Sequence, residues 1–357
     1  MKWNLSCRDV AANLNGFLCV YKPRDVSLAA LKKNLMKRLS TAGNSLEHPR
    51  PPLIEKPIVK PHKKTGALMV VGMRKQVDYS LHPLVYGMTF RPEDILLDEL
   101  EPTEVTTSGV CLFAVNEGCE RLEAVRELAW ANEYILTGVL GEKSDKNLLR
   151  SKVVMKAKYD HVNKILFEKK LSKLRHQYRR LSYELANVDI QSEEAFELAS
   201  EGKIRPKVLG SPVLYDIQLL NFHPPWFQLK VISVCENDEY LRLLVNQIAV
   251  EMKTLARPTR IQRLRIGPFQ RPHALLDKYF QLPNVIKNIK MCNRIIDHYL
   301  GQGRGDLMSS LDGDNMISLV NDYNLTDEKL QIELERSVND ELEDGDSLRI
   351  AWGRSYD

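Results

Sequence analysis

Residues 104–115 read EVTTSGVCLFAV and join a polar segment to an apolar run. The run from Val110 to Val115 follows Gly109 and consists largely of side chains that fit a buried strand. Glu104 lies five positions before Gly109. The stretch therefore predicts a core strand with one carboxylate presented on the loop that leads into it.

Outward from this strand, further strands and helices alternate in a mixed order. Strands are expected at residues 17–21, 67–73, 134–140, 213–221, 227–235 and 257–266. Helices are expected at residues 27–38, 119–132, 160–181, 192–201, 238–254 and 285–300. Ser27 is expected to cap the first of these helices. The order lacks a regular βαβ rhythm, so it favours an α+β fold over a doubly wound sheet.

The formal net charge of +4 conceals an asymmetry along the 357-residue chain. Residues 301–357 contain fourteen Asp and Glu against five Lys and Arg, a net charge of −9, which leaves +13 on residues 1–300. A basic body suits a polyanion such as nucleic acid, although basic residues also serve solubility. The acidic segment 301–357 is too polar to pack, and we expect it to be largely disordered and able to recruit a basic protein partner.

Two other segments differ in composition from the predicted body. Residues 41–65 mix five prolines with basic side chains, which predicts an extended, mobile, basic insertion able to touch phosphates. Residues 1–14 contain Lys2 and Arg8 but also Asp9, so they form at best a weak mitochondrial targeting segment.

The six cysteines lie far apart, with no CxxC pair and no Cys/His spacing of the kind that zinc needs. They are expected to be free thiols in a reducing compartment, and no metal site is expected. No apolar run reaches the roughly 20 residues of a membrane span. The sequence therefore predicts a soluble intracellular protein, with its oligomeric state left open.

Basic side chains also recur in two of the predicted elements. The helix at 160–181 carries a basic face that is either solvated or in contact with an RNA backbone. The segment near residues 257–271 contains a stripe that could follow RNA or simply face solvent: Arg257, Arg260, Arg263, Arg265 and Arg271. Strand alternation predicts that Arg263 and Arg265 share one face.

Several separated blocks resemble, in the same order, the TruB family of RNA pseudouridine synthases, and most closely its animal mitochondrial branch. These blocks are GFLCVYKP at 16–23, EVTTSGVCL at 104–112, YILTGVLG at 134–141, AFELASEGKIRP at 195–206, EYLRLLV at 239–245 and RLRIGPF at 263–269. The resemblance covers about residues 15–280. It implies a pseudouridine-synthase-type mixed sheet flanked by helices, in a single catalytic domain at 15–300 without the family's PUA module.

The resemblance also implies a function. The expected reaction isomerises uridine to pseudouridine in mitochondrial mRNA, tRNA or rRNA, in the matrix, by base flipping and without a cofactor. Glu104 would be the catalytic carboxylate, Tyr134 the ring that stacks on the flipped base, and Arg242 the partner of the carboxylate. The residues expected to bind RNA are Lys22, Arg257, Arg263 and Arg265.

Departures from the family pattern support an alternative. Glu104 stands where the family has aspartate, Pro102-Thr103 precede it in place of the usual residues, and Asn132 replaces a lysine. A displacement of about 1 Å can cost on the order of a hundredfold in rate. The alternative is a catalytically degenerate, TruB-like RNA-binding protein that acts as an RNA chaperone or ribosome assembly factor.

Each member of the expected triad also has a structural explanation. Glu104 belongs to an acidic loop and can simply be exposed, and Tyr134 can be a core residue. Arg242 can pair with Glu239 or Asp238 on its own helix, where a surface ion pair contributes less than about 1 kcal/mol.

Overall fold

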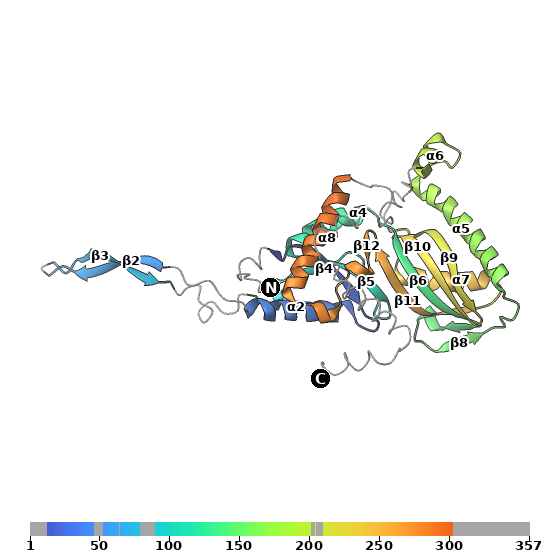
Figure 1. The fold of residues 1–357 in the computed structure, drawn as a ribbon, viewed down its shortest axis with the longest axis horizontal. Helices are drawn as coiled ribbons and strands as arrows, with labels where there is room; N and C mark the ends of the chain where they lie inside the picture. The colour runs from blue at the N-terminus through green and yellow to red at the C-terminus, as the bar shows by residue number, and fades with distance from the viewer. Residues whose placement is uncertain are drawn as a thin grey trace.

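The computed structural model describes residues 13–45, 53–63, 65–78, 90–200, 204 and 210–302. An eight-stranded mixed sheet forms the centre of the body, in the order β1-β5-β11-β6-β10-β9, with β4 beside β5 and β12 beside β11 (Figure 1). Its strands are β1 (Gly16–Lys22), β4 (Leu97–Glu99), β5 (Ser108–Val115), β6 (Asn132–Leu140), β9 (Val213–His223), β10 (Trp226–Val234), β11 (Ala256–Ile266) and β12 (Phe269–Gln270). Strands β5 and β11 pair in parallel and the other neighbours are antiparallel. The predicted α+β fold is confirmed.

The first half of the sheet is buried on both faces. Every residue of β1 and β5 is buried, which matches the apolar run from which the prediction starts. Helix α8 (Leu282–Gln302) packs along β1 and, with α4 (Leu122–Glu127), covers one face. Helix α2 (Leu28–Asn44) covers the other face, and the Ser27 side chain accepts a hydrogen bond from the Ala30 amide, so the predicted cap is confirmed.

The second half of the sheet is covered by α5 (Lys164–Ala186) and α7 (Asp238–Glu251). These helices pack on β6, β9, β10 and β11 and enclose a separate apolar cluster. The side chains of Asn163 and Asn237 cap them by accepting backbone hydrogen bonds from Leu166 and Tyr240. Helix α7 consequently begins at a fixed point beside β11, and its first turns reach the 100–107 loop between β4 and β5.

Several boundaries differ from the prediction. The helix expected at 119–132 is a 3-10 segment, η2 (Asn116–Arg121), followed by the short α4. Ala129 adopts a left-handed φ of 48°, which ends the helical path and allows Asn132 to begin β6. Helix α5 starts and ends later than expected. A small sheet that was not expected lies between β6 and α5, where β7 (Glu142–Ser144) pairs with β8 (Val153–Lys156). Helix α6 (Glu193–Ser200) matches its prediction.

A two-stranded hairpin lies apart from the body in Figure 1. It consists of β2 (Leu53–Pro61) and β3 (Leu68–Val77). The prolines of residues 41–65 predict a loop, yet residues 53–61 pair with β3 along their whole length, and α2 extends through residue 44. Cross-strand pairs such as Val59 with Val70 form in place of the expected loop. Both strands of this two-stranded hairpin are edge strands, where proline is tolerated.

Some predictions fall outside the described residues. These concern residues 1–12, residues 46–52 and the acidic tail from 303, so the targeting segment, the disorder of the tail and the lack of a PUA module stay predictions. Within the described ranges, no helix is both long and apolar enough to cross a membrane. The described cysteines, Cys19, Cys111, Cys119, Cys235 and Cys292, are free thiols, and Cys7 lies outside these ranges.

Candidate active site

Hydrogen bonds from the end of β1 and from the turn that follows it hold the 100–107 loop in place. The Lys22 ammonium donates hydrogen bonds to the carbonyl oxygens of Val105, at 3.1 Å, and Thr107. The Asp25 amide donates to the same Val105 carbonyl at 2.9 Å. These bonds explain why the polar segment before Gly109 has one defined path, and they present Glu104 on its outer side.

Glu104 is held at two points by α7. Its carboxylate forms an ion pair with Arg242, and its backbone amide donates to the carboxylate of Asp238 in the first turn of the helix. The Arg242 side chain is 7% exposed, whereas the Glu104 side chain is 42% exposed. A nearly buried guanidinium therefore anchors a carboxylate that remains open to solvent, which is not the pairing of Arg242 with its own helix.

Asp238 links the loop to the interior. Burial raises the pKa of the Asp238 carboxyl above its usual value, against the lowering effects of the Glu104 amide and of Arg263. The hydrogen bond from the Glu104 backbone amide requires an acceptor oxygen, which Asp238 supplies. Asp238 therefore holds the backbone of Glu104 and does not compete with the Glu104 carboxylate for Arg242. The acidic start of α7 gives only a helix-capping signal in the sequence, and the contact with a residue 134 positions away is not readable from it.

Tyr134 lies on β6 in the cluster beneath α7 and is 3% exposed. Its phenol lies beside Glu236 and Arg263. Burial, followed by the neighbouring Glu236, raises the pKa of Tyr134 well above its usual value, so the phenol stays protonated. The structure thus brings Glu104 and Arg242 together, and it places the Tyr134 ring in the core below them, with its hydroxyl turned to a second polar group.

Two residues predicted to bind RNA are interior residues. Lys22 is fully buried beneath the loop, and burial lowers the pKa of its ammonium to about 8. Arg263 is buried as well, and its Nε donates to the Val110 carbonyl at 2.7 Å while Nη1 lies 3.4 Å from Glu101. Neither side chain can reach a ligand from this position. Both hold the loop and β5, which corrects the expected direct contact with RNA.

Arg265 is separated from Arg263 by a bulge in β11. Arg263 lies opposite Tyr134, but the register shifts by one residue and Arg265 lies opposite Glu133. Neighbouring strand residues point to opposite faces, so the two arginines do as well, and the prediction of a shared face is wrong. Arg265, half-buried, lies near His273 and Tyr299 under α8.

Arg257 lines a cavity of about 650 Å³ beside the second half of the sheet. Its guanidinium is 3.2 Å from Glu142, and Trp226, which is half exposed, forms part of the wall. The other lining residues are mostly basic or polar: Arg24, Thr137, Leu149, Asn221, His223, Phe227, Gln228, Thr259 and Arg260. Cations beside an exposed indole are a combination that suits a nucleotide.

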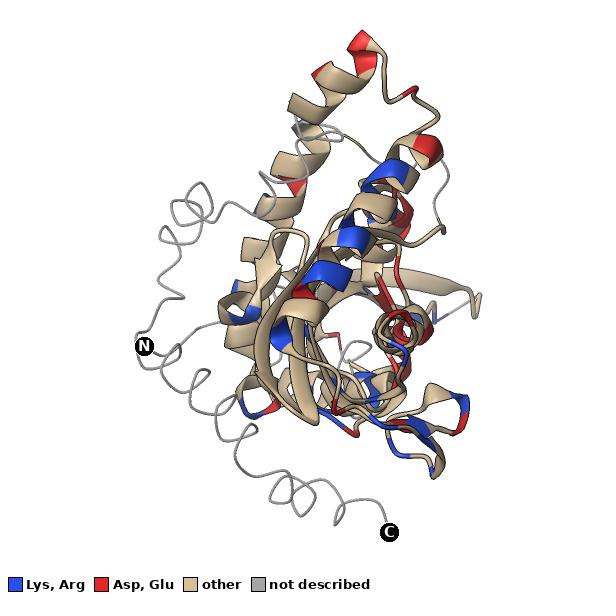
Figure 2. Ribbon diagram, turned by 90° about the vertical axis from the view of Figure 1, so that its right-hand side faces the viewer, with Lys and Arg blue, Asp and Glu red and all other residues tan. Residues whose placement is uncertain are grey.

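Basic residues recur along helix α5, which lies toward the viewer in Figure 2, and the exposed ones are Lys164, Lys169, Lys173, Arg179 and Arg180. Several of them are compensated by carboxylates: Lys164 by Glu168, Lys170 and Lys173 by Glu251, Arg175 by Asp216, and Arg180 by Glu184. Exposed pairs of this kind contribute little energy and leave the outer surface mixed in charge. The prediction of a basic face is confirmed, and RNA contact along it stays a prediction.

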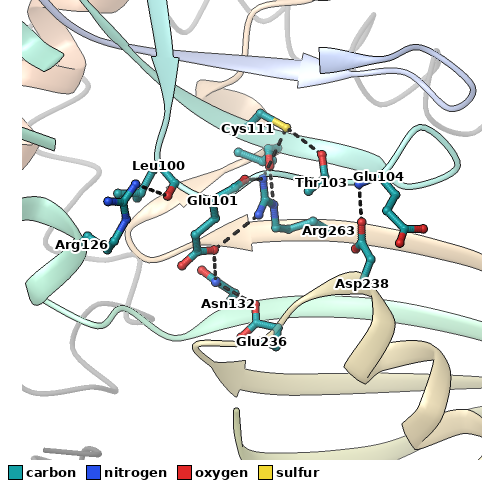
Figure 3. Close-up of polar contacts among 11 residues, drawn as sticks. Leu100, Glu101, Thr103, Glu104, Cys111, Arg126, Asn132, Glu236, Asp238 and Arg263 are labelled. Atoms are coloured by element: carbon teal, nitrogen blue, oxygen red, sulfur yellow. Dashed lines mark hydrogen bonds and ion pairs between the residues drawn. The ribbon is translucent and has the colours of Figure 1, made fainter. Parts of the chain in front are cut away.

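A second polar group, not expected from the sequence, lies at the inner end of the loop (Figure 3). The Asn132 side-chain nitrogen donates to Glu101 at 2.5 Å and to Glu236 at 2.8 Å. Arg263 approaches Glu101 from the other side. The acidic run from Asp98 to Glu104 suggests exposed carboxylates, and only the fold shows that Glu101 turns inward while Glu104 turns outward.

Comparison with known proteins agrees with this geometry. A family model described as "TruB family pseudouridylate synthase (N terminal domain)" matches residues 104–241, a span that begins at the candidate carboxylate and ends one residue before its arginine partner. "Pseudouridylate synthase TRUB2, mitochondrial" from Xenopus tropicalis is 27% identical over 285 residues, which cover 79% of this chain and 87% of that protein. The protein of the same name from Homo sapiens is 28% identical over 278 residues, which cover 77% and 82%.

Among solved structures, a chain of a Cbf5-Nop10-Gar1 complex is 12% identical, with a TM-score of 0.41, and the match covers 78% of this chain and 63% of that one. The two vertebrate relatives match over more than three quarters of the chain, and the family model matches its middle part. The chain is therefore similar to the TruB family of pseudouridine synthases, and its listed vertebrate relatives are named as mitochondrial members.

Proposed function

We propose that the protein is an RNA pseudouridine synthase. The reaction cleaves the N-glycosidic bond of a uridine, turns the base and rejoins it through carbon. A carboxylate near the sugar can serve this chemistry as a nucleophile or base. A uridine in an RNA stack is out of reach, so the nucleotide must be extruded at a cost of a few kcal/mol.

The ion pair between Glu104 and Arg242 carries the proposal. The guanidinium favours the ionised carboxylate and restricts its rotamers, while the Asp238 contact holds its backbone. The exposure of Glu104 leaves room for a sugar to approach. Asp238 holds the Glu104 amide and Lys22 holds the Val105 carbonyl, so the longer side chain of glutamate starts from a fixed backbone.

Tyr134 is proposed as the ring that receives the extruded base. Stacking on an aromatic ring contributes on the order of 1–3 kcal/mol. Since its phenol stays protonated in the free protein, its proposed role is contact and orientation, rather than action as a base. Because the Tyr134 ring is buried in the free protein, the residues packed over it on β6 must move before the base can contact it.

RNA flanking the target is proposed to lie at the cavity lined by Arg257 and Trp226, which lies on the Arg24 side of the loop. The relatives are named as mitochondrial proteins, and this similarity supports the proposed mitochondrial location. The matrix is the proposed compartment, and mRNA, tRNA or rRNA is the proposed substrate. No cofactor is proposed.

Chemical mapping of pseudouridine in cellular RNA tests the proposal. Cells that lack the protein should lose specific pseudouridines from mitochondrial RNA, and wild type should restore them. Glu104→Gln keeps the size of the side chain but removes its charge and should not restore them. A set of pseudouridines unchanged by removal of the protein would contradict the proposal.

A non-catalytic RNA-binding protein, acting as an RNA chaperone or ribosome assembly factor, is the second candidate. The burial of Tyr134 favours it, because a ring closed to solvent is not ready to receive a base. In that case, the defects of cells that lack the protein should be rescued equally by wild type and by Glu104→Gln.

A further inference from the structure

The second polar group joins the three segments that carry the proposed triad. Glu101 belongs to the loop of Glu104, Asn132 lies two residues before Tyr134, and Glu236 lies just before the helix of Arg242. One side-chain nitrogen, that of Asn132, bonds to both glutamates (Figure 3). The bonded oxygens are consequently no farther apart than the sum of two hydrogen-bond lengths. We name this set of three residues the carboxyl bridge.

The carboxyl bridge has more acceptor oxygens than its donor hydrogens can satisfy. Asn132 is fully buried, and within the described part of the chain its Oδ1 and the Oε2 of Glu236 are buried atoms without a hydrogen-bond partner. A buried acceptor without a donor costs about 1–3 kcal/mol, and two neighbouring carboxylates repel each other as well. One additional proton on a carboxyl group relieves both problems, because it removes a negative charge and converts an acceptor into a donor.

We propose that Glu101 carries one bound proton beside Asn132 and Glu236, and that this proton locks the 100–107 loop in the position that presents Glu104. The three residues are positioning residues, since none is placed against the substrate. The proposal deepens the proposed function, but the lock itself is a property of the free protein.

The charges around the bridge agree with one proton rather than none or two. Burial raises the pKa of Glu101 to about 7, with Glu236 as the next cause, whereas Arg263, the hydrogen bond from Asn132 and Arg126 lower it. Arg263 approaches Glu101 from β11, Arg126 lies on α4, and the protonated phenol of Tyr134 faces Glu236 from β6. Arg126 also pairs with Glu123 at 2.6 Å, so Arg263 is the main positive charge at the bridge, and one proton offsets the negative charge that Arg263 does not.

The sign of the pH effect follows from this arrangement. A carboxyl group whose pKa is raised in the folded protein holds its proton between its unfolded value and about 7, so its stabilising protonated form is present at low pH. As the pH rises through about 7, Glu101 loses its proton to solvent and is repelled by the neighbouring Glu236. The loop then loses its lock, while the ion pair of Glu104 with Arg242 remains.

Hydrogen exchange of the 100–107 loop, measured on the full chain without RNA, tests the proposal. After correction for intrinsic exchange rates, wild type should exchange several-fold faster at pH 7.5 than at pH 6, a range that crosses the pKa of Glu101 and stays below that of Lys22, which holds the same loop. Glu101→Gln imitates the protonated carboxyl group and should remove this pH dependence. Glu236→Gln does the same from the other side and serves if the first variant fails to fold.

The exposed Glu120 offers the matched control. Glu120→Gln should retain the wild-type pH dependence. Exchange in wild type that does not change with pH, or a pH dependence that survives in both bridge variants, would overturn the proposal. Because the experiment uses neither RNA nor catalysis, a protein that fails to form pseudouridine but shows the lock would refute the proposed function alone.

Discussion

At the scale of single residues, the path of the 100–107 loop depends on buried basic side chains and on the backbone conformation of a glycine. Lys22 and Arg263 carry charges into the interior, and each donates to main-chain oxygens of the segment around Glu104. Gly109 lies where β5 meets β11, with a φ of 130°. The path of the loop is therefore determined from below, and Glu104 inherits its position from residues that never meet the substrate.

Substitution of Gly109 tests this dependence. A β-carbon there would lie 2.0 Å from the Arg263 carbonyl oxygen, on a backbone that L residues rarely adopt. Gly109→Ala should lower the free energy of unfolding by about 3 kcal/mol or more, measured by urea denaturation. Gly72→Ala in the β2–β3 hairpin, where no atom lies within 4 Å, is the control and should change it by less than about 0.5 kcal/mol. Equal effects would show that β5 and β11 do not meet as described.

At the scale of elements, the body and the hairpin contribute unequally to stability. Helix α8 supplies buried side chains to both clusters around β1 and β5, including Ile286, Ile289, Ile295 and Ile296. The β2–β3 hairpin instead exposes apolar side chains such as Leu68 and Met73, and isolated two-stranded hairpins are only marginally stable. The fold of the body should therefore not depend on the hairpin.

Replacement of residues 53–77 by a short Gly/Ser linker should leave the melting temperature of the protein within about 2 °C of wild type, because little buried apolar surface is lost. The measurement is a thermal melt followed by circular dichroism. Ile295→Ala in α8 provides the comparison and should lower the melting temperature by several degrees, since truncation of a buried Ile costs about 2–5 kcal/mol. A large loss in the hairpin variant would contradict the division between body and hairpin.

At the scale of the whole molecule, local patterns predicted the elements better than their contacts. Apolar runs and capping residues identified β1, β5, β6, β9, β10, β11 and most helices, because each signal lies within a few neighbouring residues. Strand β3 was predicted at 67–73, whereas its partner β2 was missed because its two prolines disfavour a strand. Arg263 and Arg265 were wrongly predicted to lie on one face of the sheet. A one-residue bulge between them reverses the alternation of side chains, and the amino-acid composition of the strand does not indicate it.

The site shows the same limit. Resemblance within motifs identified Glu104 and Arg242, which the fold then brings together across 138 positions. The resemblance also led to the prediction that Lys22 and Arg263 bind RNA at the surface. In a basic chain, the sequence does not indicate which Lys and Arg side chains are buried. The carboxyl bridge joins residues from three distant segments, and no linear pattern relates them.

The rate of pseudouridine formation by purified protein under single-turnover conditions tests the central claim most directly. Wild type should convert a uridine in its target RNA, and Glu104→Gln should be slower by at least about a thousandfold while its affinity for the RNA changes by less than about threefold, since the variant loses a reacting group and keeps the binding surface. Undiminished conversion by Glu104→Gln would contradict the account.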